Sequence, residues 1–105
     1  MAGRLSKSDA EGLLRHCLED GIVIRGRHFR EELAAEGLEF EDALVVLRKG
    51  RIHDEPEPDV KTGEWKYRIE GYEPGGKWLA IVFCFKGTDQ TFLITVFPVK
   101  SRGRR

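Results

Sequence analysis

The sequence predicts an α+β two-layer domain, in which helices from the N-terminal half cover a mainly antiparallel sheet of four to five strands. Two observations carry this prediction. Apolar residues recur at helical spacing up to Gly50, and beyond it they alternate with polar residues or run continuously. Gly and Pro separate the later apolar runs, as turns between strands require. With 105 residues the chain has room for one core, so we expect a single domain over residues 1–100 and a basic flexible tail over 101–105.

The first helix is expected to begin near Ser8, because Ser8 and Glu11 have the spacing of a capping box. An apolar stripe at positions 10, 13, 14, 17 and 18 gives this helix one buried face, and Gly21 ends it. The β-branched run over residues 22–24 predicts a short strand.

Two more helices are expected before Gly50. Phe29 and Leu33 form the inner stripe of one that Gly37 ends, and the pattern repeats from Phe40 to Gly50. Beyond that point the predicted strands cover residues 51–54, 65–70, 78–85 and 91–99, with a loop over 55–63 and turns over 73–76 and 86–90. The run 78–85 is apolar on both faces and is therefore the central strand. The predicted order is α-β-α-α-β-β-β-β.

Composition narrows the function classes. Lys and Arg balance Asp and Glu, and the isoelectric point of about 6.8 is unlike that of most nucleic-acid binders. No apolar run is long enough to span a bilayer, and the N-terminus lacks the apolar core of a secretory signal. Cys17 and Cys84 lie far apart in apolar segments, which is typical of a reducing cytoplasm. No metal-ligand spacing and no nucleotide-binding loop is present, so we expect neither a metal nor another cofactor.

The segment Arg25–Arg30 (RGRHFR) is the first candidate site. It lies where a strand is expected to meet a helix N-terminus, which favours anions. Arginines bind phosphate through paired N–H groups, and His28 is the only local group able to move a proton near neutral pH. Alternatively, the arginines are solvated or pair with Glu31 and Glu32, while His28 caps or packs.

Lys66 and Arg68 form the second candidate, because alternation along a strand places both on one face. An exposed sheet face with ordinary charges explains the pair equally well.

From Arg27 to Val99 the sequence resembles a bacterial family of small domains of unknown function, allied to the RelE/ParE toxin superfamily. The segments that carry the resemblance are Arg27-His28-Phe29, Glu36-Gly37-Leu38, Phe40-Glu41-Asp42-Ala43, Leu47–Ile52, Trp65–Gly71 and Leu93–Phe97. With the first helix included, the layout also resembles MqsR-type ribonuclease toxins, which have similar Leu-Glu-Phe-Glu and C-terminal Phe-x-x-Lys stretches.

The resemblance implies a RelE-like fold, metal-independent cleavage of mRNA and neutralisation by an antitoxin. It places a polar catalytic position on Lys66, a catalytic tyrosine position on Trp78 and a C-terminal lysine on Lys100. The leading hypothesis is therefore the toxin of a bacterial toxin–antitoxin pair, which cleaves RNA or binds RNA or the ribosome. Its catalytic residues are His28 for proton transfer and Lys66 and Arg68 for phosphate stabilisation, and its RNA contacts are Arg25, Arg27, Arg30 and Lys100.

The alternative is a non-catalytic, protein-binding scaffold of the same fold, which the neutral isoelectric point and Trp78 favour. The sequence leaves open whether the chain is an enzyme.

A partner surface is also predicted. Arg25, Arg27, Arg30, Lys66 and Arg68 are expected to share one cationic cleft that an acidic antitoxin segment neutralises. The acids of residues 31–42 and 54–59 would repel phosphate, so we expect them on the opposite side. The strand 91–99 is expected to expose an edge that accepts a partner strand or a second copy of the chain.

Overall fold

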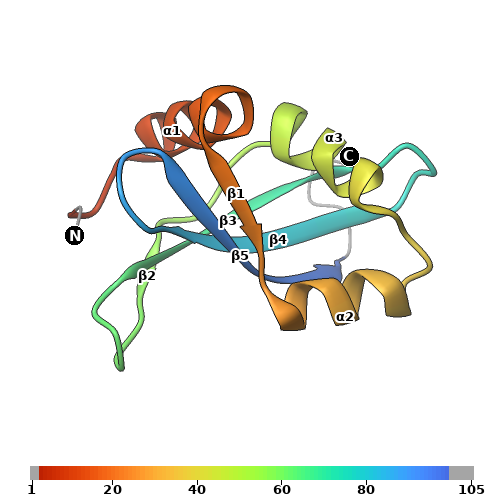
Figure 1. Cartoon of the computed structure of the whole chain (residues 1–105). Helices are drawn as coiled ribbons and strands as arrows, with labels where there is room; N and C mark the ends of the chain where they lie inside the picture. The colour runs from red at the N-terminus through yellow and green to blue at the C-terminus, as the bar shows by residue number, and fades with distance from the viewer. Residues whose placement is uncertain (1–2, 100–105) are drawn as a thin grey trace.

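A computed structural model describes residues 3–99, and it confirms the α+β class and the predicted order of elements (Figure 1). Within this range the elements are α1 (Lys7–Asp20), β1 (Ile22–Arg25), α2 (Arg27–Ala35), α3 (Phe40–Lys49), β2 (Glu57–Pro58), β3 (Trp65–Tyr72), β4 (Trp78–Phe85) and β5 (Gln90–Pro98).

The strands form one mixed sheet in the order β1-β5-β4-β3-β2. β1 runs parallel to β5, and the other neighbours are antiparallel. β4 lies in the middle, as its apolar residues on both faces predict, and Leu79, Ala80 and Ile81 are fully buried.

The main core lies between this sheet and the helices. The register places Tyr67 opposite Phe83 and Ile69 opposite Ile81, so these side chains share one sheet face, and they pack with residues of α1 and α3. α2 lies against β5 and contributes Phe29, whose ring contacts Phe40 edge-on at a centroid distance of 6.3 Å. The alternate side chains of β3, β4 and β5 therefore point away from α1 and α3. We call this second side the outer face.

A close approach of two backbones fixes α3 against β3. A Cβ atom at Gly50 would lie 2.5 Å from the carbonyl oxygen of Glu70, and one at Gly71 would lie 3.1 Å from the Cα atom of Gly50. Only glycine fits this contact. It allows Arg51 to pair with Glu70 through two backbone hydrogen bonds.

The predicted start of the first helix is wrong by half a turn. Ser6 is the N-cap, and its hydroxyl oxygen accepts a hydrogen bond from the backbone N–H of Asp9 at 3.0 Å. Glu11 does not close a capping box with Ser8, because its carboxylate accepts the backbone N–H of Ile52 at 2.7 Å. Glu11, which the local pattern assigned to the helix cap, is therefore bound by Ile52, a residue far away in the sequence.

The segment after α3 also differs from the prediction. Residues 51–54 form only the single bridge between Arg51 and Glu70, whereas the predicted loop contains the short strand β2. Glu57 pairs with Lys66, and Pro58 pairs with Trp65. Proline is tolerated because β2 is the last strand of the sheet and has a neighbour on one side only.

The predicted exposed edge of the last strand is wrong for its first part, residues 91–93. β5 has β4 on one side, and on the other side β1 pairs with its residues from Gln90 to Leu93. α2 follows β1 and lies against the same strand (Figure 1). The edges of the sheet are β1 and β2, and association of two copies through an edge strand stays a prediction.

Candidate functional site

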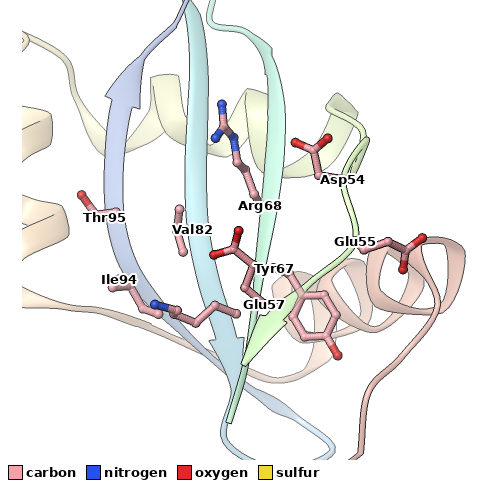
Figure 2. A pocket seen from close by; sticks show the side chains of 9 residues that line it. Asp54, Glu55, Glu57, Tyr67, Arg68, Val82, Ile94 and Thr95 are labelled. Carbon is pink, nitrogen blue, oxygen red and sulfur yellow. The ribbon is translucent and has the colours of Figure 1, made fainter. Parts of the chain in front are cut away.

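The outer face carries a hollow of about 340 Å³ at the side of the sheet where β2 meets β3 (Figure 2). Its size falls within the range of ligand pockets, about 300–1,000 Å³. Residues from β3, β4 and β5 and from the segment that contains β2 line it: Asp54, Glu55, Glu57, Lys66, Tyr67, Arg68, Val82, Ile94 and Thr95. In the register of the sheet Arg68 lies opposite Val82, and Val82 lies opposite Thr95, so a row of side chains crosses three strands.

Arg68 is a positioned cation in this hollow. Its Nε donates to an oxygen of Glu70 at 2.8 Å, and its guanidinium lies 5.2 Å from the ring centroid of Phe97. The other carboxylate oxygen of Glu70 accepts a hydrogen bond from the indole nitrogen of Trp78 at 2.9 Å. Glu70 is buried, so the carboxylate that holds Arg68 is itself fixed. This arrangement fixes the direction of the guanidinium, and within residues 3–99 its terminal nitrogens make no hydrogen bond, so they can bind a ligand.

Lys66 differs from Arg68 in its surroundings. Within residues 3–99 its ammonium group makes no hydrogen bond or ion pair, although Glu57 is its cross-strand neighbour on β2. The side chain of Glu57 is equally without a hydrogen bond or ion pair in that part of the chain. The pKa of Asp59 is lowered, first by backbone hydrogen bonds from Lys61 and Thr62 and in part by the charge of Lys66. Within the described residues, however, neither Lys66 nor Glu57 makes a direct contact with an opposite charge.

Glu55, by contrast, forms ion pairs with the N-terminal segment. Arg4 and Lys7 both form ion pairs with its carboxylate. The pKa of Glu55 is lowered from its ordinary value, first by the hydrogen bond from Arg4. Tyr67 lines the hollow from its strand, but its ring is buried in the core, and its hydroxyl oxygen accepts the backbone N–H of Leu5 at 2.9 Å.

The predicted common cleft is wrong, because the Arg25–Arg30 segment lies apart from the hollow. The guanidinium of Arg25 lies 4.6 Å from the ring centroid of Phe40. Arg27 and Arg30 line a separate, shallow depression on α2, where Nε of Arg27 donates to Glu31 at 3.0 Å. Neighbours in a helix point about 100° apart, so a run of charges there does not converge on one point.

His28 projects from α2 with 64% of its side chain exposed, and its Nε2 lies 3.9 Å from a carboxylate oxygen of Glu32. It does not line either of these depressions. The alternative of local pairing with Glu31 and Glu32 thus describes Arg27 and His28 better than the cleft does. Lys100 and the basic tail over 101–105 lie outside the described residues.

The expected separation of acids from bases is also wrong. Asp54, Glu55 and Glu57 line the same hollow as Lys66 and Arg68. The pairing of β2 with β3 brings them there, and the acidic, proline-containing stretch gave no sign of that strand. Thr95 was also missed, although alternation along the last strand places it on the outer face.

A second charged cluster lies on the outer face next to Lys66, where the pairing of Tyr67 with Phe83 continues towards Cys84. Nζ of Lys86 lies 2.9 Å from both carboxylate oxygens of Glu64, and Sγ of Cys84 lies 3.5 Å from one of them. Burial raises the pKa of the Cys84 thiol to about 11, and the hydrogen bond to Glu64 raises the pKa of Lys86. A protonated thiol is a poor nucleophile, so this cluster is structural.

Between residues 3 and 99 no three His, Cys, Asp or Glu side chains gather in a way that could hold a metal ion. No helix in that range is both long and apolar enough to cross a membrane.

Fold and site together define a small α+β domain with one sheet face packed on helices and a mixed-charge hollow on the other. The chain belongs to the DUF4258 family, a domain of unknown function, whose model matches residues 25–98. The matched segment runs from the last residue of β1 to the last residue of β5 and so includes the whole β3–β5 part of the hollow. No curated protein and no solved structure matches the chain. Kinship with the RelE/ParE and MqsR toxins stays a prediction.

Proposed function

We propose that this protein is the toxin of a bacterial toxin–antitoxin pair, and that it binds and cleaves RNA at the hollow of the outer face without a metal ion. The observation that carries the proposal is the placement of Lys66 and Arg68 side by side in one hollow, with Arg68 oriented by Glu70. Phosphate is the ligand that such a pair of cations suits best, because arginine offers paired N–H groups and lysine a mobile point charge.

The chemistry of RNA cleavage fits these groups. Attack of a 2′-hydroxyl on the neighbouring phosphate develops negative charge on the phosphoryl oxygens, and fixed cations stabilise it. Arg68 would supply that stabilisation without moving, since a buried carboxylate already holds it, and Lys66 would add a mobile positive charge. Thr95 adds a hydroxyl to the same hollow.

Aromatic side chains beside the hollow offer a place for RNA bases. Trp78, whose indole is tied to Glu70, contacts Tyr72 edge-on at a ring distance of 4.7 Å, and Tyr72 is 46% exposed. Single-stranded RNA is commonly held by stacking of its bases on such rings. Since the net charge of the chain is zero, attraction to RNA would be local and affinity modest.

A non-catalytic, protein-binding scaffold is the second candidate, and the acids of the hollow favour it. Asp54, Glu55 and Glu57 lie around Lys66 and Arg68, so the surface suits a peptide that carries both signs of charge. The exposed isoleucines Ile22 and Ile24 on the edge strand β1 add an apolar contact for a protein partner.

One experiment separates the two candidates. The purified chain is incubated with an unstructured, fluorescently labelled RNA in the presence of EDTA, and cleavage products are separated on a gel. We expect cleavage by the unaltered protein and its loss in the double variant Lys66→Ala, Arg68→Ala. The matched control is Arg48→Ala, Lys49→Ala, which removes the same charges from exposed positions at the end of α3 and should keep cleavage.

Growth after induced expression in bacteria tests the toxin role. The unaltered chain and the control variant should arrest growth, and the Lys66, Arg68 variant should not. Intact RNA and normal growth with the unaltered chain would contradict the proposal and leave the protein-binding scaffold.

A further inference from the structure

We propose that Glu57 is the general base of this ribonuclease reaction. The inference rests on the proposed function and names the proton acceptor that the cations of the hollow still lack. His28, the proton carrier expected from the sequence, does not line the hollow, whereas Glu57 does.

The register of the sheet places Glu57 correctly for this role. It is the Cα partner of Lys66 in the antiparallel pair of β2 and β3, and such partners project to the same face. Figure 2 shows its carboxylate reaching from β2 over the sheet towards β4, on the side where Arg68 and Val82 also project. A phosphate held by Lys66 and Arg68 would therefore lie beside this carboxylate.

The other titratable groups of the hollow are less suited to accept a proton. Arg4 and Lys7 engage Glu55, and Asp54 also has an interaction partner. The hydroxyl of Tyr67 lies in the core and contacts Leu5. Among the described carboxylates that line the hollow, Glu57 is the one without a hydrogen bond or ion pair, so a substrate hydroxyl would meet no competitor for it.

The step balances with the groups present. The Glu57 carboxylate takes the proton of the 2′-hydroxyl as the 2′-oxygen forms a bond to phosphorus. The bond from phosphorus to the 5′-oxygen breaks, and the ammonium of Lys66 gives its proton to that oxygen. The products are a 2′,3′-cyclic phosphate and a free 5′-hydroxyl. Glu57 then releases its proton to water, and Lys66 regains one. Lys66 serves here both as cation and as acid, while Arg68 stays charged throughout.

The test replaces Glu57 by glutamine, which keeps the shape and removes the basic oxygen. Removal of a general base costs about 10²–10⁴-fold in rate, so we expect Glu57→Gln to slow single-turnover cleavage by about 100-fold or more. Affinity for the same RNA with 2′-O-methyl groups, which cannot be cleaved, should change by less than about threefold.

The matched control is Glu19→Gln, an exposed carboxylate on α1 that does not line the hollow. It should keep cleavage within about threefold. Glu57→Asp, which shortens the side chain but keeps the base, should recover part of the rate that Glu57→Gln loses. Circular dichroism melting of each variant establishes that a lost rate does not come from a lost fold.

The results that would overturn the inference differ from those that would overturn the proposed function. If Glu57→Gln cleaves as the unaltered chain does, while Lys66→Ala, Arg68→Ala does not, the base is another group and the ribonuclease stands. If Glu57→Gln weakens 2′-O-methyl RNA binding as much as cleavage, Glu57 is a binding residue. If the unaltered chain does not cleave RNA at all, both proposals fall.

Discussion

Two lysines on the outer face occupy contrasting surroundings. Lys86 follows the end of β4, and its Nζ lies 2.9 Å from both carboxylate oxygens of Glu64. Its charge is therefore neutralised by a residue of the same chain. Lys66, on β3, has no such partner within the described residues, although it lines a hollow with Glu57. In the sequence, Lys66 is predicted within a strand and Lys86 just after one, and nothing there distinguishes their surroundings. A lysine on a sheet face is therefore not by itself evidence of a binding site. A lysine without a direct partner of opposite charge is a better candidate for binding a ligand.

The largest expected effect concerns the two carboxylates that contact Arg68 and Lys86, namely Glu70 and Glu64. Glu70 is buried and accepts hydrogen bonds from Arg68 and Trp78, whereas Glu64 lies at the rim beside Lys86. We expect Glu70→Ala to lower the free energy of unfolding by about 3 kcal/mol, because hydrogen bonds to a charged group are worth about 1.5–3 kcal/mol each and their donors lose them. Glu64→Ala should cost less, about 1 kcal/mol, because its partner Lys86 is 37% exposed and can be hydrated when the carboxylate is removed.

Urea unfolding followed by tryptophan fluorescence measures both values. Glu70→Gln keeps the shape and part of the hydrogen bonding and should fall between them. Equal stability losses for Glu70→Ala and Glu64→Ala would show that the buried carboxylate of the hollow stabilises the fold no more than Glu64 does.

RNA affinity is the next contrast. We expect Lys66→Ala to weaken binding of 2′-O-methyl RNA by about tenfold, and Lys86→Ala by less than about twofold, because only Lys66 is free to contact phosphate. Fluorescence anisotropy at several salt concentrations measures both effects. Loss of one phosphate contact should also reduce the slope of log affinity against log salt by about one for Lys66→Ala only. The reverse order of the two lysines would move the binding surface from the hollow to the neighbouring cluster of Glu64, Cys84 and Lys86.

The fold could be predicted because its signals are local. The helical stripes, the change of period after Gly50 and the apolar run 78–85 each follow from a few neighbouring residues, and the structure places the elements in that order. The predicted helix start failed where Glu11 found a partner 41 positions away, at Ile52. Such a long-range hydrogen bond has no trace in a local pattern.

The candidate site was half predictable for the same reason. Alternation along a strand placed Lys66 and Arg68 on one face, and the structure bears this out. The run Arg25–Arg30 is denser in charge, but it extends from the end of β1 into α2, whose side chains point in different directions. Arg25 contacts the ring of Phe40, and Arg27 contacts Glu31. Glu57 could not be found from the sequence, because only the pairing of the two-residue strand β2 with β3 brings it to the hollow.

The smallest expected effect concerns Cys84, which shares Glu64 with Lys86. Burial is the main cause that raises the pKa of this thiol from its ordinary value of 9.0 to about 11, and Glu64 raises it further. The folded state therefore holds the thiol proton more tightly than the unfolded state. The stability that this contributes is complete below pH 9 and is lost as the pH rises towards 11.

Alkylation by iodoacetamide, which needs the thiolate, should be slow at pH 8 and should accelerate up to about pH 11. Glu64→Gln removes the carboxylate and should move that midpoint downwards, but only in part, because the burial remains. Arg48→Ala should leave the midpoint where it is, since Arg48 lies at the end of α3 and not on the outer face. Mass spectrometry of the peptide around Cys84 separates its alkylation from that of the buried Cys17. A midpoint near pH 9 in the unaltered chain would mean that the Cys84, Glu64 and Lys86 cluster is open to water, and the contrast between the two lysines would then disappear.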